Sequence, residues 1–318
     1  MIHLAHPEFR IHPITTLKQD TLTIGIIDYL NVEPLYYRLQ ERLAGKPVAF
    51  RRGVPTELNR ALVAGEVDLA PISAIVAAEM ADHVAVLPDL SIATMGAVKT
   101  VLLFSWMADP RELDDVRIAL SEESATSVAL VKILARHFWH VRPRYVVEPQ
   151  DLTQMLRRSA AALLIGDDAL VESAHRREIP GRGQPYAFDL GDEWLKWTGL
   201  PFVFALWAAR REVLPLIADL DIVPALYESK AEGLAHIPEI ARAYAPRLGL
   251  PVGVLTKYLH DLRYDLRPRD RAGLLTFLQL ALPLFEPDAL LCWHPQDGLQ
   301  ALFAGIEPAN AVVAECRA

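Results

Sequence analysis

The chain has 318 residues, and a usual domain size of roughly 150 residues predicts about two domains. Apolar types make up 52% of the residues and charged types 23%, which excludes a disordered or fibrous chain and predicts a sizeable core. Lysine and arginine total 32 against 40 aspartate and glutamate residues, and this net charge of −8 argues against nucleic acid and anionic membrane surfaces as partners.

We expect residues 1–20 to form a poorly ordered extension. They hold three histidines and two prolines without a continuous apolar stretch, so they do not resemble a secretory signal. We expect His3, His6 and His12 to be solvated rather than to bind metal, because no packed scaffold would fix the ligand geometry.

The sequence predicts a cytoplasmic protein. It contains no run of about 18 apolar residues, so we expect no transmembrane helix. The two cysteines, Cys292 and Cys316, lack metal-ligand spacing and give no disulfide framework, which suits a reducing compartment.

From Thr21 onward, short apolar runs alternate with helical patterns, which is typical of an α/β protein with buried strands. The elements expected in the first unit are strands at residues 21–30, 48–51 and 67–70 and helices at residues 32–43 and 55–63. Gly65 closes the second helix with a left-handed turn, and Ser73 stands where it can cap the next one.

A second unit follows the apolar strand at residues 99–106 and the turn signal Asp109-Pro110. The elements expected in it are strands at residues 116–120, 144–147 and 161–165 and helices at residues 126–137 and 152–158. Another apolar strand is expected at residues 201–208, and residues 213–318 have a mostly helical pattern.

The strands at residues 99–106 and 201–208 bracket a segment with its own β-α-β pattern. The simplest topology is an inserted lobe, with these strands as two crossovers. The first lobe is then residues 21–106 plus 201–318, and the second is residues 107–200. Two α/β lobes joined in this way place a ligand cleft at their interface. We therefore expect a two-lobed, binding-protein-like fold, with two independent domains side by side as the alternative.

The sequence lacks the usual motifs of several kinds of chemistry. The sequence lacks GxGxxG, GxxxxGK[ST], HExxH and GxSxG, the motifs of nucleotide cofactors, zinc proteases and serine hydrolases. His137 and His140 could pair on a metal, but the aromatic residues between them favour a partly buried helix end. Cys292 lies near His294, yet neighbours in sequence rarely form a nucleophile and base pair. We expect neither a cofactor nor a metal.

Small polar residues follow several of the expected strands. They are Asn31, Ser73, Ser124, Thr126, Ser127 and Asp167. Each alone is more often a helix cap than a site residue. In a two-lobed protein, however, these junctions open onto one cleft, where the free N–H groups of helix N-termini suit carboxylates or phosphates.

These junctions carry motifs that together resemble a known family. The motifs are Tyr29-Leu30-Asn31 with Pro34-Leu35, Gly65-Glu66-Val67-Asp68 leading to Ser73, Ser124-Ala125-Thr126-Ser127-Val128, Leu163-Leu164-Ile165-Gly166-Asp167, and the stretch from Trp194 to Phe204. They resemble the chorismate dehydratases of the futalosine route to menaquinone, over residues 21 to about 277. The resemblance implies a type-II periplasmic-binding-protein fold.

The sister family, the 1,4-dihydroxy-6-naphthoate synthases, shares that fold and is the first alternative. Its members typically carry a histidine-serine motif and a catalytic histidine in the inserted lobe. This chain has Asp28-Tyr29-Leu30-Asn31 at the first junction, which favours the dehydratase family.

The resemblance implies loss of water from chorismate to give 3-[(1-carboxyvinyl)oxy]benzoate, a lyase reaction that aromatisation drives. It also implies that Asn31 is the catalytic residue. Because a carboxamide does not titrate near neutral pH, Asn31 would orient the leaving hydroxyl or the group that takes the proton. Our hypothesis is that the enolpyruvyl carboxylate of the substrate accepts the proton from C3.

Chorismate is a dianion, and the motifs contain few basic residues, so we expect hydroxyls and helix N-terminal amides to bind it. The residues that the resemblance assigns to substrate binding are Ser73, Thr100, Ser124, Thr126, Ser127, Asp167, Thr198 and Gly199. Packing in a strand is the alternative for Thr100, and helix capping is the alternative for Ser124 and its neighbours. We expect Asp167 to fix its loop or a neighbouring amide, since like charges repel. Thr198 and Gly199 could give backbone contacts or hinge freedom.

Two binding functions remain as alternatives. A small-anion receptor of a transport system would need an export signal or a lipidated cysteine, and neither is visible. The effector domain of a transcription regulator would need a helix-turn-helix segment, for which residues 1–20 are too short. The sequence leaves open whether the protein is a monomer or a homodimer.

Overall fold

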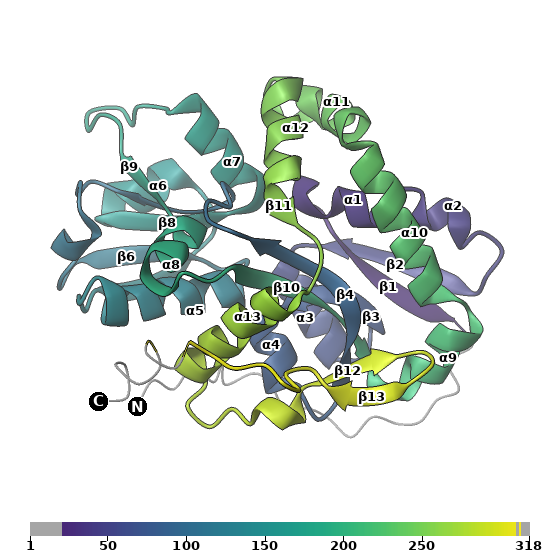
Figure 1. Cartoon of the computed structure of the whole chain (residues 1–318). Coiled ribbons are helices and arrows are strands. Elements are labelled where there is room, and N and C mark those ends of the chain that lie inside the picture. Colours follow the sequence, from purple (N-terminus) through teal and green to yellow (C-terminus); the bar gives the residue numbers. More distant parts are fainter. Residues whose placement is uncertain (1–20, 310–311, 313–318) are drawn as a thin grey trace.

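The structure is a computed structural model that describes residues 21–309 and residue 312 (Figure 1). The expectations for residues 1–20 and for Cys316 lie outside the described residues. Within the described ranges, no helix has the length and apolar character needed to cross a membrane.

Two β-sheets organise the chain, and each forms the centre of one lobe (Figure 1). The first sheet has the order β13-β12-β4-β10-β3-β1-β2, with β11 paired to β4, and the second has the order β7-β6-β8-β5-β9. The strands of the first sheet are β1 (Leu22–Ile27), β2 (Val48–Gly53), β3 (Leu69–Ser73), β4 (Val84–Thr94), β10 (Phe202–Arg210), β11 (Leu262–Arg263), β12 (Leu291–His294) and β13 (Gly298–Ala301). The strands of the second sheet are β5 (Val101–Ser105), β6 (Arg117–Ser121), β7 (Arg144–Glu148), β8 (Ala161–Ile165) and β9 (Tyr186–Asp189).

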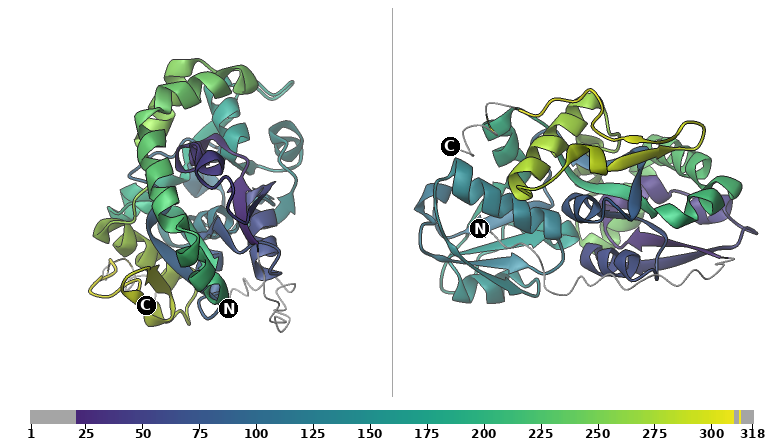
Figure 2. Two further views of the ribbon diagram at one scale, coloured as in Figure 1. Left: turned by 90° about the vertical axis from the view of Figure 1, so that its right-hand side faces the viewer. Right: turned by 90° about the horizontal axis from the view of Figure 1, so that it is seen from below.

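Helices surround both sheets, and the view from below in Figure 2 shows the two lobes side by side. The helices of the first lobe are α1 (Glu33–Tyr36), α2 (Leu39–Arg42), α3 (Pro55–Val63), α4 (Ala74–Glu79), α9 (Leu214–Asp219), α10 (Ile222–Ala235), α11 (Ile237–Leu248), α12 (Val252–Asp261) and α13 (Pro268–Ala281). The helices of the second lobe are α5 (Ala125–Ile133), α6 (Leu152–Arg158), α7 (Gly166–His175) and α8 (Leu190–Thr198). The α/β fold expected from the alternating pattern is confirmed.

The lobe boundary differs from the sequence expectation. Strand β5 pairs with β8 and β9, so it belongs wholly to the second sheet, whereas β10 pairs with β3 and β4 in the first. The chain therefore passes between the lobes in the short connections at residues 95–100 and 199–201, not along these two strands. Placing the boundary after residue 106 was wrong because β5 is buried along its whole length, and a uniformly apolar strand does not reveal its sheet.

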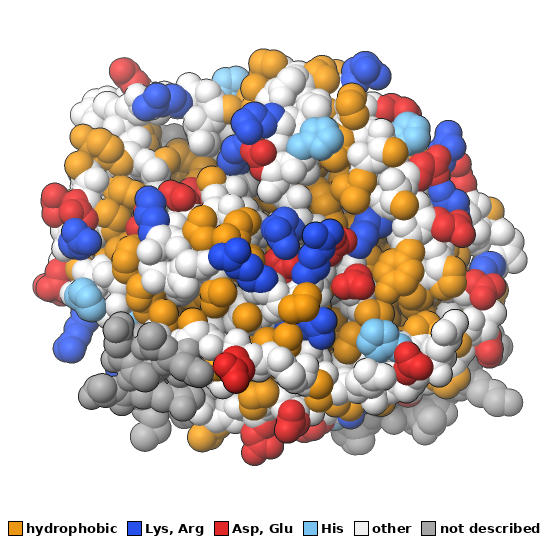
Figure 3. All heavy atoms as spheres, in the orientation of Figure 1, with side chains coloured by type: hydrophobic (Ala, Val, Ile, Leu, Met, Phe, Trp, Pro, Cys, Tyr) orange, Lys and Arg blue, Asp and Glu red, His pale blue; other side chains and the backbone are white. Residues whose placement is uncertain are grey.

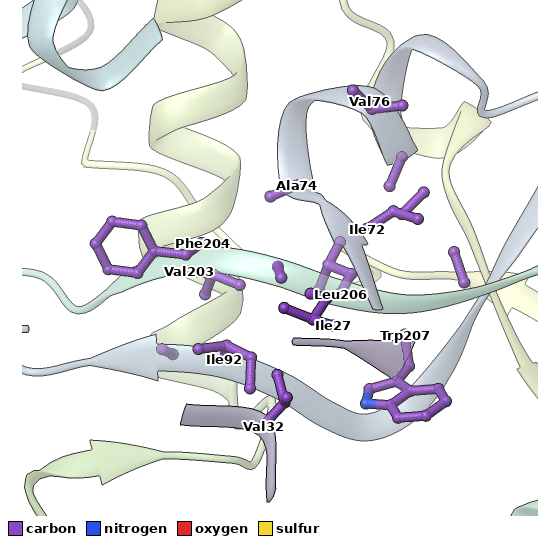
Figure 4. Packing of buried hydrophobic residues seen from close by; sticks show 14 of the residues in the cluster. Ile27, Val32, Ile72, Ala74, Val76, Ile92, Val203, Phe204, Leu206 and Trp207 are labelled. Atoms are coloured by element: carbon purple, nitrogen blue, oxygen red, sulfur yellow. The ribbon is translucent and has the colours of Figure 1, made fainter. Parts of the chain in front are cut away.

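The core of the first lobe is built on β10, which is buried along all of its length. Figure 4 shows side chains of β10, β3 and β4 packed together, with Leu206, Ile72 and Ile92 among them. All three are buried, and burial of one such side chain stabilises the fold by about 1.5 to 3 kcal/mol. This packing gives the strand ends a rigid platform.

One expected helix was wrong and one strand was missed. The helix expected at residues 32–43 is broken into a 3₁₀ turn at Leu30–Val32 and the short helices α1 and α2, because Arg38 takes a left-handed conformation with a φ of +55°. Strand β4 was not expected at all. The mostly helical pattern expected after residue 213 is confirmed by α9 to α13, and the β12–β13 hairpin follows them.

Basic side chains gather near the middle of the face in Figure 3, over β11 and the start of α13, with acidic side chains among them. Two of the ion pairs in this part of the fold are Arg263 with Asp270 and Arg267 with Asp265. Lys230 of α10 also contacts Asp265, at 2.7 Å. These charges therefore join α10, β11 and α13 to one another.

Candidate active site

The carboxyl ends of four strands meet at the interface between the lobes. In the first sheet β1 and β3 run parallel, and in the second sheet β6 and β8 run parallel, so each pair ends at one edge. Two hydrogen bonds join the edges: the Leu30 N–H donates to Asp167 Oδ1 at 3.0 Å, and the Ile75 N–H donates to Thr126 Oγ1 at 3.3 Å. Ligands of α/β proteins bind at such edges.

Asn31 lies in the 3₁₀ turn that follows β1, directly after the residue that bonds to Asp167. Its Oδ1 atom is buried and accepts no hydrogen bond from any residue that the structure describes. Leaving a buried acceptor unpaired costs about 1 to 3 kcal/mol. The Asn31 amide therefore holds an acceptor oxygen that the described residues leave unpaired.

Asp167 stands in the first turn of α7 and has two different oxygen environments. Its Oδ1 accepts the Leu30 N–H, whereas its buried Oδ2 receives no hydrogen bond within the described chain. The Arg247 guanidinium of α11 is 3.8 Å from Oδ2. Burial raises the pKa of Asp167 to about 6, although the Leu30 amide and Arg247 both favour the ionised form. The side chain thus fixes a neighbouring amide across the interface.

Tyr29 contributes a second link between the lobes. Its hydroxyl donates a hydrogen bond to Glu123 in the loop between β6 and α5. Its ring lies against Gly166, where a Cβ atom would be 2.6 Å from the ring carbons Cε1 and Cζ. Gly166 also has a φ of +66°, which an L side chain rarely adopts. Glycine at this position therefore permits both the turn into α7 and the approach of Tyr29.

Ser73 was expected to cap the next helix, and this expectation was wrong. It is the N-cap residue of α4, but its side chain makes no capping hydrogen bond. Its hydroxyl instead accepts from Asn59 Nδ2 at 3.1 Å, and its own N–H donates to Asn59 Oδ1 at 3.1 Å. Asn59 of α3 therefore orients Ser73.

Ser124, in contrast, does cap its helix. Its hydroxyl oxygen accepts the Ser127 N–H at 3.2 Å, and the same hydroxyl donates to Ser127 Oγ at 2.9 Å. Thr126 is engaged with α4 through the Ile75 N–H. The capping alternative thus holds for Ser124, while Thr126 and Ser127 place their hydroxyls in the first turn of α5. All three are buried.

Thr100 is also buried, and it lies just before β5. Its Oγ1 accepts a hydrogen bond from the Tyr258 hydroxyl of α12 at 3.2 Å, and its carbonyl accepts the Gly166 N–H at 2.9 Å. Thr100 therefore supports both α12 and the start of α7.

Thr198 and Gly199 have different neighbours from the other residues of the expected set. The Thr198 hydroxyl donates to the Trp194 carbonyl at 2.8 Å, and Gly199 ends α8 in a left-handed conformation. The Gly199 carbonyl accepts from Arg269 of α13 at 2.9 Å. They mark the second connection between the lobes, where their bonds go to α8 and α13.

Sequence reasoning assigned no role to Tyr29, Asn59, Glu123 and Arg247. Tyr29 stood in the Tyr29-Leu30-Asn31 motif, and Asn59 had a signal because it is a polar residue on the apolar face of the helix expected at residues 55–63. Glu123 and Arg247 are brought to the interface by pairings across 94 and 80 positions of sequence, which periodicity does not report.

The described residues contain no group of three or more histidine, cysteine or acidic side chains placed to hold a metal ion. His137 stacks on Trp197 with ring centroids 6.3 Å apart, which suits the partly buried helix end expected for it.

The chain is similar to proteins of one metabolic route. A family model described as menaquinone biosynthesis matches residues 22–282. A curated relative, the chorismate dehydratase of Thermus thermophilus, is 40% identical over 278 residues, which cover 83% of this chain and 98% of the relative.

Solved structures show the fold. A crystal structure of an Archaeoglobus fulgidus protein superimposes with a TM-score of 0.65 at 18% identity, covering 83% of this chain and 98% of that one. The alkanesulfonate-binding protein of Xanthomonas axonopodis pv. citri, bound to MOPS, gives a TM-score of 0.60 at 16% identity, covering 85% and 96%. A Candida albicans protein described as having the generic periplasmic binding protein fold gives 0.54 at 15% identity, covering 85% and 92%. The two-lobed binding-protein fold is therefore confirmed.

Proposed function

Because the chain belongs to the menaquinone biosynthesis family, we propose that it is a chorismate dehydratase, a lyase that converts chorismate into 3-[(1-carboxyvinyl)oxy]benzoate and water. The observation that carries the proposal is the 40% identity to a chorismate dehydratase, which extends over nearly all of that relative. The hydrogen bond from Leu30, the residue before Asn31, to Asp167 of the second lobe supports it by placing Asn31 beside the interface.

The reaction balances without a cofactor. Chorismate loses a proton from C3 and hydroxide from C4, which amount to one water overall, and the electrons of the C3–H bond complete the aromatic ring. We propose that the enolpyruvyl carboxylate of the substrate takes the C3 proton. The protein then has to hold the dianion in one geometry and to stabilise the departing hydroxyl.

Asn31 is the residue proposed to act on the leaving group. Its buried Oδ1 can accept a hydrogen bond from the C4 hydroxyl of chorismate and so orient it, and its Nδ2 can donate a hydrogen bond as negative charge develops on the leaving oxygen. The hydroxyls of Ser73, Thr126 and Ser127 are proposed to bind a substrate carboxylate, together with the first amides of α5. Thr100 and Asp167 position the neighbouring turns.

The acidic side chains at the interface oppose a dianionic ligand, and their environment weakens this opposition. Burial raises the pKa of both Glu123 and Asp167. Arg247 adds a positive charge 3.8 Å from Asp167. Hydrogen bonds to a charged ligand contribute about 1.5 to 3 kcal/mol each, so four or five of them suffice for micromolar affinity.

The test is to incubate the purified chain with chorismate and to follow the ultraviolet spectrum of an aromatic product. Mass spectrometry must show a product lighter than chorismate by one water. Heat-denatured chain is the control, because chorismate also rearranges by itself. Binding of chorismate without conversion would instead support the small-anion binding protein.

As a chorismate dehydratase, the protein would bind a small dicarboxylate as its partner. Its proposed location is the cytoplasm, a reducing compartment. Burial raises the pKa of the Cys292 thiol to about 12 and keeps it protonated. Size-exclusion chromatography with light scattering distinguishes a monomer from a homodimer.

A further inference from the structure

We propose that Tyr29 is a positioning residue, which places Asn31 for catalysis only while the two lobes are joined through Glu123 and Gly166. The inference deepens the proposed function, on which its catalytic readout rests. It concerns how the second lobe controls the 3₁₀ turn at Leu30–Val32, which the first lobe carries.

The turn has little internal support. It is three residues long, its N-cap residue Tyr29 makes no capping hydrogen bond with its side chain, and the Val32 N–H reaches the Tyr29 carbonyl only at 3.4 Å. Short 3₁₀ turns of this kind have poor hydrogen-bond geometry of their own. Neighbouring segments must therefore fix the position of Asn31.

Tyr29 supplies the first of these contacts. Its ring is packed on Gly166 of α7, and its hydroxyl donates to the Glu123 carboxylate. Both partners belong to the second lobe. The ring contact and the hydrogen bond restrain different parts of the side chain, so together they fix its direction.

Glu123 is itself held in place. The Gln150 Nε2 donates to its carboxylate at 2.9 Å, while Gln150 Oε1 accepts the Ile165 N–H at 2.6 Å. Gln150 therefore ties the Glu123 loop to the end of β8, directly before Gly166. The acceptor and the glycine surface that Tyr29 contacts form one rigid unit of the second lobe.

Asn31 lies between anchors in both lobes. On its N-terminal side, Tyr29 and the Leu30 N–H are bound by the second lobe. On its C-terminal side, Pro34 of α1 packs against α10, where a Cβ on Gly233 would be 2.1 Å from the Pro34 carbonyl oxygen. Separation of the lobes breaks the first set of contacts and leaves the second. Joining the lobes and ordering Asn31 are therefore one event.

The decisive variant is Tyr29→Phe, which keeps the ring on Gly166 and removes only the hydroxyl. We expect kcat to fall by about tenfold or more, with KM changed by less than about threefold, because a hydrogen bond to a carboxylate is worth about 10- to 100-fold. Glu123→Ala should lower kcat by a factor similar to that of Tyr29→Phe. Glu123→Gln, which retains an acceptor oxygen, should keep most of the activity. Tyr227→Phe is the control, since that hydroxyl donates to the Pro88 carbonyl within the first lobe.

Hydrogen exchange of the Leu30 amide gives a readout that needs no substrate. Loosening of the turn in Tyr29→Phe should accelerate this exchange by about tenfold relative to the wild type and to Tyr227→Phe. An unchanged kcat or an unchanged exchange rate overturns the inference. If the wild type fails to convert chorismate, the proposed function falls, and exchange alone decides whether Tyr29 positions the turn.

Discussion

Replacing Asp167 by asparagine should stabilise the protein at neutral and alkaline pH. Burial raises the pKa of this carboxyl from an ordinary value of 3.8 to about 6, so the folded chain binds the Asp167 proton more tightly than the unfolded chain does. The stability linked to that proton is fully present below pH 3.8 and is lost as the pH rises through about 6. At pH 8 the folded protein therefore carries an unfavourable buried charge.

The size of the effect follows from the two pKa values. The difference between 3.8 and about 6 corresponds to about 3 kcal/mol at pH 8 and about 1.5 kcal/mol at pH 5. An asparagine in the same place is neutral, and its carbonyl oxygen can still accept the Leu30 N–H. The free energy of unfolding of Asp167→Asn should therefore exceed that of the wild type by these amounts.

Urea unfolding followed by tryptophan fluorescence at pH 5 and pH 8 measures the difference directly. The expected result is a more stable variant at both values, with a gain about twice as large at pH 8. A variant that is no more stable than the wild type at pH 8, or a gain that does not depend on pH, would show that burial does not govern this carboxyl.

Three further changes test the interface. Gly166→Ala should lower the unfolding free energy by at least about 1 to 2 kcal/mol, since alanine is strained at a φ of +66° and its Cβ meets Tyr29; unchanged urea midpoints would contradict this. Arg247→Ala should move the pH at which Asp167 titrates upward, because the guanidinium favours the carboxylate, and a carbon-detected NMR titration checks it. Asp189→Ala should cost about 2 to 4 kcal/mol in urea unfolding, because its carboxylate accepts four backbone N–H groups, and Asp189→Asn should cost less.

Apolar runs located the central strands correctly. The stretches around Leu22–Ile27, Ala161–Ile165 and Phe202–Arg210 are mostly apolar and are almost entirely buried in the sheets, so pattern and structure coincide there. Strand β4 was not predicted because Pro88 and Asp89 interrupt its apolar pattern. The structure accommodates them where the pairing of β4 with β10 shifts register, and Asp89 has a φ of +51°.

The site was predictable in part for a similar reason. Polar residues directly after strands can be recognised in a sequence, and Asn31, Ser73 and Asp167 do lie at strand ends of the interface. Their partners come from distant segments. The bond from Tyr29 to Glu123 spans 94 positions and exists only because two lobes face each other, which no local pattern encodes.

Turnover of chorismate by Asn31→Ala and Asn31→Asp, with substrate binding measured in parallel, tests the central claim most directly. The account predicts that both variants bind chorismate and that each loses about a hundredfold or more in kcat, as expected when an oriented hydrogen-bonding group is removed from a developing charge. Rates near those of the wild type in both variants would contradict it.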